Sequence, residues 1–355
     1  MASDAKHRLL FLDGVRGWAA LMVLLFHVFI RFLSPTTPAY RIAALRFITD
    51  GQLAVFIFFT VSGFALTVKF RERPDFQGIV RETVTRYFRL TLPIFITSFF
   101  AYVFMKAHLL YNLGIAQATH SPQWLGSFFN FEPSFGGLLG SSFFWVFIGS
   151  YRRTLYNPNL WTMTTEFQGS ILIFILAALC LPNADGKKTL SWRWPLLLFF
   201  PAIIFPDLDC FIFGFLLAGL YRKKIMTARW IGAAAAALFA ALVYYLTFFK
   251  PANDYILGFS GMFLVGAVSF SPHLKGFFSS RLSVFLGTIS FPLYLIHILV
   301  ICSFSSWLFG LGVSVDTIAA LTVAVSLIAA WILVPMEEFS INAAKWIGNA
   351  VCGQR

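Results

Sequence analysis

The stretch FLDGVRGWAALMVLLFHVFI, residues 11–30, is the first long apolar run of this chain, and it contains Arg16 and His27. Ionisable side chains are costly at membrane depth, so those that occur there usually serve a substrate or ion path. Eleven residues at about 100° each make three turns plus roughly 20°, which places both side chains on one helix face, about 16 Å apart. The stretch therefore predicts a membrane helix with a fixed cation near one end and a titratable imidazole near the other.

The composition of the whole chain is that of a polytopic membrane protein. Of its 355 residues, 59% are hydrophobic and 12% are charged, and the mean hydropathy is +0.78, whereas soluble domains carry about 25% charged residues. The formal net charge of +12 is explained by Lys and Arg in cytoplasmic loops, and no stretch indicates nucleic-acid binding. We expect an all-α integral membrane protein, with residues 1–355 forming one transmembrane domain and no separate soluble domain.

Apolar runs of spanning length predict about ten transmembrane helices. The run 131–149 is rich in Gly and Ser, and we expect an interfacial or re-entrant segment there. With both termini in the cytoplasm, 19 of the 27 Lys and Arg residues lie in inner segments and seven in outer segments, as the positive-inside rule requires. The ten predicted spans are residues 10–31, 51–69, 88–107, 160–181, 193–206, 209–221, 229–249, 255–271, 283–304 and 313–334.

Two further ionisable residues are predicted to share the depth of His27, in the outer half of the membrane. They are Glu166, in the fourth predicted span, and His297, in the ninth. A carboxylate beside an imidazole raises its basicity and fixes its tautomer, so we expect His27 to be a general base with Glu166 next to it. The alternatives are structural: a hydrogen-bonded histidine, and a carboxylate favoured by the dipole near a helix start.

Arg86 and Arg89 stand just before the third predicted span, at the inner face towards which Arg16 also lies. Arginine matches phosphate geometry with two parallel hydrogen bonds, so the three cations predict a phosphate site. The alternative for Arg86 and Arg89 is a plain positive-inside anchor.

Four more residues are secondary candidates for substrate binding or support. Asp13 precedes Arg16 by three residues, so it pairs with it along the helix or caps the helix start. Ser62 is either a small residue at a helix contact or a nucleophile. Arg152 and Arg153 are predicted in an outer loop, where they meet an acidic glycan or lipid phosphate or are simply solvated. No cluster of ligands suggests a metal.

These residues occur in blocks that resemble the membrane acyltransferase 3 family. LDGVRGWAALMVLLFH is similar to the family's first-helix signature, an Arg and a His separated by ten residues, and Arg16 and His27 match it. The resemblance continues, in the family's order, through IFFTVSGFALT (57–67), RYFRLTLP (86–93), LWTMTTEFQGS (160–170) and SFPLYLIH (290–297). Two departures, Gln168 and Gly169 in place of an aromatic pair and Phe291 in place of Tyr, obscure the subfamily.

The resemblance implies an integral membrane enzyme that moves an acyl group, most often acetyl, from cytoplasmic acyl-CoA to a hydroxyl of an extracytoplasmic glycan such as a surface or secreted polysaccharide. It implies His27 as the essential histidine, Arg16 as its paired arginine, and Arg86, Arg89 and Glu166 as further polar site residues. We expect a multi-pass protein of the plasma (inner) membrane that works without a metal, alone, as a homo-oligomer or with a polysaccharide-synthesis partner.

Three alternatives stay open at this point. The same buried charges would serve a transporter or flippase for a glycan or an acyl carrier. The same chemistry would serve an acyltransferase that acts on a lipid or small molecule. Finally, His27 would act either as a base or as a nucleophile that carries the acyl group.

Overall fold

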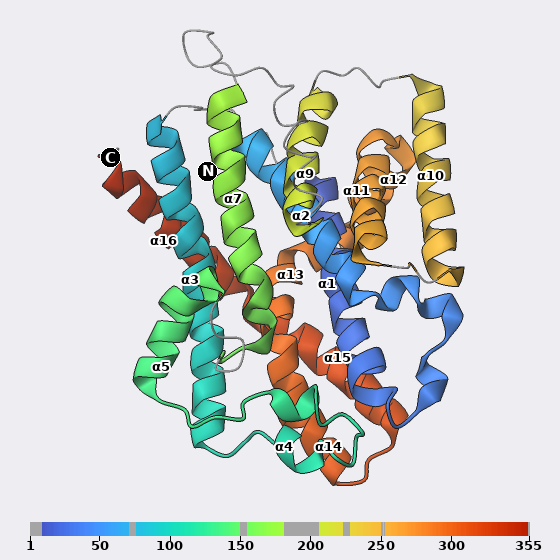
Figure 1. The fold of residues 1–355 in the computed structure, drawn as a ribbon, viewed down its shortest axis with the longest axis vertical. Helices are drawn as coiled ribbons and strands as arrows, with labels where there is room; N and C mark the ends of the chain where they lie inside the picture. The colour runs from blue at the N-terminus through green and yellow to red at the C-terminus, as the bar shows by residue number, and fades with distance from the viewer. Residues whose placement is uncertain are drawn as a thin grey trace.

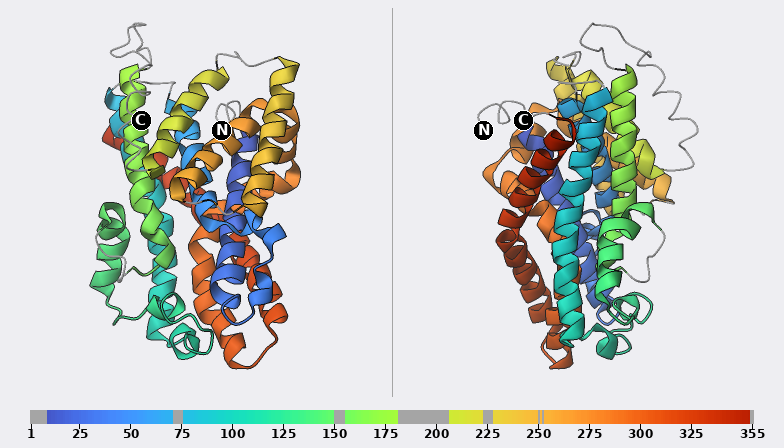
Figure 2. Two further views of the ribbon diagram at one scale, coloured as in Figure 1. Left: turned by 45° about the vertical axis from the view of Figure 1, so that its right-hand side comes forward. Right: turned by 90° about the vertical axis from the view of Figure 1, so that its left-hand side faces the viewer.

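The computed structural model describes residues 9–70, 76–149, 155–180, 206–222, 228–249, 251 and 253–353. Every regular element in these residues is a helix, which confirms the all-α expectation. Figures 1 and 2 show long helices, many of them running roughly along one axis, and Figure 1 shows three short helices, α4, α5 and α14, in the lower half. The elements in chain order are α1 (Leu10–Leu25), η2 (Phe26–Leu33), η3 (Pro38–Tyr40), η4 (Ala43–Leu45), η5 (Phe47–Thr49), α2 (Gly51–Phe70), α3 (Phe76–Lys106), α4 (Asn112–Ile115), η6 (Leu125–Ser127), α5 (Phe135–Gly140), η7 (Ser141–Trp145), α6 (Val146–Ile148), η9 (Pro158–Leu160), α7 (Trp161–Cys180), α9 (Pro206–Arg222), α10 (Arg229–Phe248), α11 (Asp254–Phe270), α12 (Pro272–Phe278), α13 (Arg281–Val300), η11 (Ile301–Ser305), α14 (Ser306–Gly310), α15 (Val315–Ile332) and α16 (Val334–Val351).

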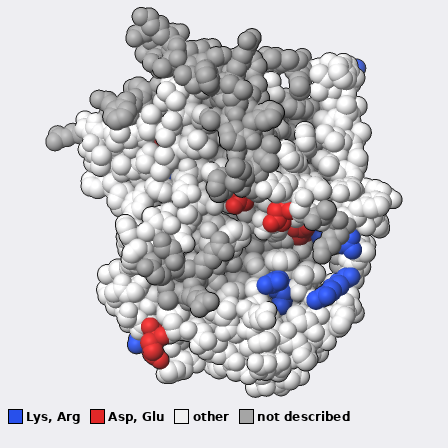
Figure 3. All heavy atoms as spheres, in the orientation of Figure 1, with Lys and Arg blue, Asp and Glu red and all other residues white. Residues whose placement is uncertain are grey.

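The described residues contain seven helical segments that are long and apolar enough to cross a bilayer, which makes this a multi-pass membrane protein. Figure 3 shows one face of the molecule, on which the described surface carries few charged side chains, as expected for contact with lipid. The seven segments are Leu10–Leu33, Gly51–Val68, Gly78–Lys106, Pro158–Cys180, Arg229–Phe248, Arg281–Gly310 and Val315–Val351.

The count of ten predicted spans is therefore matched only in part. The span expected at 255–271 corresponds to α11, which passes the same test only together with α12 and is bent against it by 100°. The span at 209–221 corresponds to α9, a helix of 17 residues, and the span at 193–206 lies outside the described residues except for its last position. Ten spans and two cytoplasmic termini stay predictions.

The segment at 131–149 is helical but shorter than a spanning helix. It forms one apolar stretch, Phe135–Ile148, from α5, η7 and α6. A stretch of this length is typical of interfacial or re-entrant segments rather than of a membrane span. Its relation to the bilayer stays a prediction.

The last predicted span, 313–334, corresponds to α15, which ends at Ile332. A further helix that was not predicted, α16, follows after Leu333 alone. Pro335 lies in the first turn of α16, where proline's missing N–H costs no helical hydrogen bond. Figure 2 shows α16 running along α3, and Gly348 permits this contact because a Cβ there would lie 2.1 Å from Oγ1 of Thr85.

Helices α1 and α13 pack together with their backbones in contact. A Cβ on Gly17 would lie 2.3 Å from the amide nitrogen of Gly287 in α13, and one on Gly14 would lie 1.8 Å from the carbonyl oxygen of Phe278 at the end of α12 and 3.0 Å from Cβ of Ser283 in α13. In the other direction, a Cβ on Gly287 would lie 2.4 Å from the carbonyl oxygen of Asp13. Only glycine at these positions lets the helices approach so closely, and such small-residue interfaces are typical of membrane helix pairs.

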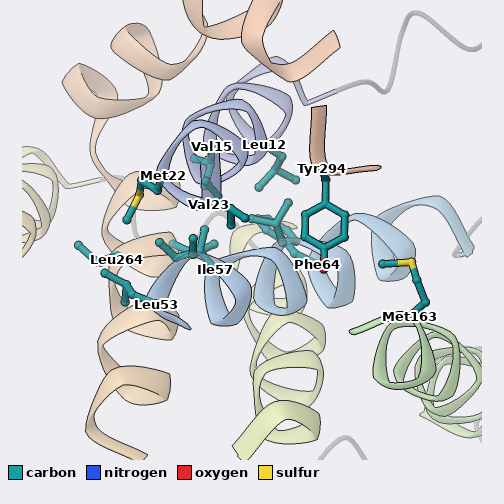
Figure 4. Close-up of a cluster of buried hydrophobic side chains, with 14 of the residues drawn as sticks. Leu12, Val15, Met22, Val23, Leu53, Ile57, Phe64, Met163, Leu264 and Tyr294 are labelled. Carbon is teal, nitrogen blue, oxygen red and sulfur yellow. The ribbon is translucent and has the colours of Figure 1, made fainter. Parts of the chain in front are cut away.

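An apolar core surrounds this pair of helices. Figure 4 shows side chains of α1, α2 and α11 pointing towards one another, with Tyr294 of α13 and Met163 of α7 at one edge. This packing fixes the rotation of α1, and so decides which way its polar side chains point. The labelled side chains of α1, α2 and α11 are Leu12, Val15, Met22, Val23, Leu53, Ile57, Phe64 and Leu264.

The contact between α1 and α13 can be tested with a single methyl group. We expect Gly17→Ala to lower the free energy of unfolding by about 1–3 kcal/mol, because its Cβ would overlap the backbone of Gly287. The matched control is Gly219→Ala in α9, where a Cβ meets nothing within 4 Å; alanine should there be neutral or stabilise by about 0.5–1 kcal/mol. Thermal unfolding of both variants in detergent measures the difference, and equal melting temperatures would contradict the prediction.

Candidate functional site

Two histidines from distant parts of the sequence meet inside the bundle. His27, in the first turn of η2, and His297, on α13, lie 2.9 Å apart between Nδ1 of His27 and Nε2 of His297. Their rings stack with centroids 5.0 Å apart. His297 is fully buried, whereas His27 is half-buried, so His27 is the member of the pair that a substrate can reach.

Both histidines lie where an α-helix widens into a π-helix. The helix α1 becomes the π-helix η2 at Phe26, one residue before His27. The helix α13 becomes the π-helix η11 at Ile301, one turn after His297. π-Helical turns are rare and occur frequently at functional sites, so this coincidence on both helices marks the histidine pair as a site.

Trp124 stacks on the ring of His27. The indole of Trp124 lies almost parallel to the His27 ring, with centroids 5.7 Å apart and an angle of 14°. The guanidinium of Arg31 lies 5.4 Å from the centroid of the same indole. Trp124 comes from the connection between α4 and η6, so a segment without regular helix supplies one of the contacts of the His27 ring.

Asn157 and Asn159 attach the start of α7 to α13. The amide of Asn157 donates to the carbonyl of Leu295 at 2.6 Å, and that of Asn159 donates to the carbonyl of Tyr294 at 3.0 Å. The amide nitrogen of Asn159 also lies 3.2 Å and 3.4 Å from the two ring nitrogens of His297. Sequence reasoning missed both asparagines, although the polar triplet NPN directly before an apolar segment was a signal for them.

A separate pocket holds the three arginines predicted to bind phosphate. Arg16, Arg86 and Arg89 all line it, together with Ser62 and Glu166. Glu166 pairs with a guanidinium nitrogen of Arg86 and accepts a hydrogen bond from Ser62 at 2.7 Å. Arg86 Nε donates to the hydroxyl of Ser170 at 3.0 Å. Glu337 also lines the pocket, so three arginines face two carboxylates there, and the one positive charge in excess favours an anion.

Arg16 contributes a buried donor that lacks a partner in the described part of the chain. Its Nε is buried and has no hydrogen-bond partner among the described residues. Arg89 is close enough to Arg16 and Arg86 to be repelled by their positive charges. The negative charges of Glu337 and Asp13 partly offset this repulsion. A buried donor without a partner costs about 1–3 kcal/mol, which an anionic ligand in the pocket would recover.

Tyr294 lies between the arginine pocket and the histidine pair. It lines the pocket, and its ring centroid lies 6.2 Å from that of His297. Its hydroxyl donates to the carbonyl of Asn159 at 2.6 Å and lies 2.7 Å from the hydroxyl of Thr162. The two parts of the site are therefore neighbours connected by one tyrosine.

The structure corrects two expectations about carboxylates. Glu166 was expected beside His27, but its side chain faces Arg86 and Ser62, and His297 takes the place next to His27. Asp13 was a candidate cap, but α1 begins after Leu9, with no side-chain cap. In both cases the cause is packing: the face that each helix buries decides the partner. Arg152 and Arg153 lie outside the described residues.

The structure also shows the surroundings of Ser62, for which the sequence left two roles open. The hydroxyl of Ser62 donates its hydrogen bond to Glu166. This contact supports the position of Glu166 and is not the contact expected of an activated nucleophile. Among the described residues, no group of three His, Cys, Asp or Glu side chains lies close enough to hold a metal.

Comparison with known proteins gives two matches. The family model described as "Acyltransferase domain" matches residues 9–335. A protein of Phomopsis amygdali named O-acetyltransferase PaAT-1 is 23% identical over 359 residues, covering 82% of this chain and 72% of the relative. No solved structure matches.

The pair of Arg86 and Glu166 generates a prediction about stability. Both side chains are about 11% exposed, and removing one partner of a buried pair leaves an uncompensated charge. We expect Glu166→Gln to lower the free energy of unfolding by about 3 kcal/mol or more. Glu132→Gln, at an exposed position, is the control and should change it by less than about 0.5 kcal/mol. Thermal unfolding in detergent measures both changes. Equal melting temperatures for Glu166→Gln and Glu132→Gln would show that Glu166 does not compensate the charge of Arg86.

Proposed function

We propose that this chain, which belongs to the acyltransferase family whose model matches residues 9–335, moves an acetyl group from cytoplasmic acetyl-CoA to a hydroxyl of an extracytoplasmic glycan. One observation carries the proposal: α1 brings Arg16 to an arginine pocket and His27 to a histidine pair, and Tyr294 lies between the two. An anion-binding pocket next to a base is what transfer from a phosphorylated thioester donor requires.

The arginine pocket is suited to the phosphates of the donor. Arg16, Arg86 and Arg89 present guanidinium groups, which bind phosphate oxygens through paired hydrogen bonds. Arg16 contributes the buried Nε that lacks a partner. From there the pantetheine arm, similar in length to the rise of about 16 Å over eleven helical residues, would carry the thioester past Tyr294 to His27.

His27 would act as the general base. It removes the proton from the acceptor hydroxyl, whose oxygen attacks the thioester carbonyl, and the C–S bond then breaks. The thiolate that leaves takes the proton from His27, so that free CoA and the acyl ester are the products. A covalent acyl-imidazole at His27 is the second route. No step uses a metal.

The acceptor is proposed as a surface or secreted polysaccharide, and the location as the plasma (inner) membrane with the arginine pocket towards the cytoplasm. The relative from Phomopsis amygdali is named an O-acetyltransferase, which supports acetyl as the group transferred to oxygen. A lipid or small-molecule acceptor would use the same two halves of the site.

The function is tested by acyl transfer with the purified protein in lipid. We expect CoA release and label on the glycan when acetyl-CoA, labelled on the acetyl group, is supplied with membrane glycans. His27→Ala should reduce both by about 10²-fold or more, because general-base catalysis contributes about 10²–10⁴. If the wild-type protein binds glycan but consumes no acetyl-CoA, the chain is a transporter or flippase instead.

The arginine pocket is tested with two donors that differ in their phosphates. We expect Arg89→Gln to raise the KM for acetyl-CoA by about 10-fold or more, since a hydrogen bond to a charged group is worth about 1.5–3 kcal/mol. The KM for S-acetyl-N-acetylcysteamine, which has no phosphate, should not change. Arg41→Gln, at an exposed loop position, is the matched control. Equal effects on both donors would contradict phosphate binding.

A further inference from the structure

We propose that His297 is a positioning residue that holds His27 in one tautomer, so that Nε2 of His27 carries the reactive lone pair. The inference rests on the proposed function for its catalytic meaning, but the tautomer itself follows from hydrogen-bond geometry. Which ring nitrogen carries the proton is set by the partner of the other nitrogen. In this site the partners form a chain of hydrogen bonds in which the donor and the acceptor of each bond can be assigned.

The chain begins at the backbone of α13. Nδ1 of His297 lies 2.8 Å from the carbonyl oxygen of Leu293, one turn earlier. A carbonyl oxygen can only accept, so Nδ1 of His297 must carry a proton. His297 is fully buried, and its polar contacts are to Leu293, Asn159 and His27, none of which is a carboxylate. Because an unpaired buried charge is costly, the ring is neutral and its Nε2 has a lone pair.

The proton between the two histidines is thereby assigned. Nε2 of His297 can only accept, so Nδ1 of His27, at 2.9 Å, must donate. Nε2 of His27 is left with a lone pair and no partner among the described residues.

The planes of both rings are held as well. The amide nitrogen of Asn159 is almost equally far from the two nitrogens of His297, at 3.2 Å and 3.4 Å. Nδ1 of His297 already donates to Leu293, so Nε2 is the acceptor of the ring, and Nδ1 of His27 at 2.9 Å is closer to it than the amide of Asn159 at 3.2 Å. Trp124 lies parallel to the other ring. The pair therefore has one hydrogen-bonding direction and little rotational freedom.

A neutral histidine suits this role in a membrane bundle. In the serine protease triad, a buried carboxylate holds the catalytic histidine in the correct tautomer. A carboxylate here would be a further desolvated charge, which is costly without a paired cation. His297 supplies the acceptor without a charge. When Nε2 of His27 takes the proton of the acceptor hydroxyl, the imidazolium stays hydrogen-bonded to His297 through Nδ1, and the Nε2 proton then passes to the leaving thiolate.

The tautomer is tested first, without reference to activity. The protein is labelled with ¹⁵N-histidine, reconstituted in lipid, and compared with His27→Gln to assign the His27 signals in the NMR spectrum. We expect a protonated Nδ1 and an unprotonated Nε2 at His27, and loss of this single tautomer in His297→Leu. A protonated Nε2 at His27 in the wild-type protein overturns the inference, whether or not the protein transfers acyl groups.

The catalytic consequence is tested with substituted histidines at position 27. We expect His297→Ala to lower kcat by about 10²-fold with an unchanged KM for acetyl-CoA, and His297→Gln to retain more activity because its amide oxygen still accepts. In the His297→Ala background, Nδ1-methylhistidine at position 27 should restore activity, since the methyl group fixes the lone pair on Nε2. Nε2-methylhistidine should abolish it.

The controls separate this inference from the proposed function. His273→Gln, at an exposed position of α12, should leave kcat unchanged. Absence of transfer by the wild-type protein would refute the proposed function and leave the NMR result standing. Transfer by the wild-type protein, with no rescue by Nδ1-methylhistidine or with activity of the Nε2-methyl form, would refute the role of His297 alone.

Discussion

The contact between the backbones of α1 and α13 is the constraint on which the rest of the site depends. Gly17 and Gly287 lack the side chains that would otherwise separate the two helices. At the resulting distance, His27 and His297 come within 2.9 Å of each other further along the same pair of helices. A larger residue at the crossing would move both histidines apart, because packed helices shift as rigid bodies rather than bend locally.

The structure distributes its polar groups in two different ways. The arginine pocket contains charged side chains that are only partly paired. Glu166 pairs with Arg86, while a buried nitrogen of Arg16 has no hydrogen-bond partner among the described residues. At the histidine pair the groups are neutral, and their order comes from carbonyl and amide contacts. Such a division fits a reaction in which one end binds a permanent anion and the other end moves a proton.

Several features were predictable because they depend on local pattern alone. The apolar runs identified the long helices, and the cost of burying charge singled out Arg16 and His27. The partner of His27 was not predictable in this way. Glu166 and His297 are both ionisable residues at a similar predicted depth, and only the rotation of α7 against α2 and α3 turns Glu166 towards Ser62 and Arg86. Asn159 was missed because the triplet NPN marks the start of a helix but does not tell that the amide reaches the backbone of α13.

By itself, the sequence determined that this is a helical membrane protein of the acyltransferase family, with costly polar side chains on its first, third, fourth and ninth predicted spans. The composition and the hydrophobic periodicity of the sequence are enough for this prediction, because both can be read from each segment separately. The tertiary structure alone decided that His297 is the neighbour of His27, that the arginines form one pocket, and that Tyr294 lies between the two parts. These relations depend on how helices far apart in sequence rotate and approach, which is a property of their packed surfaces together and not of any one segment.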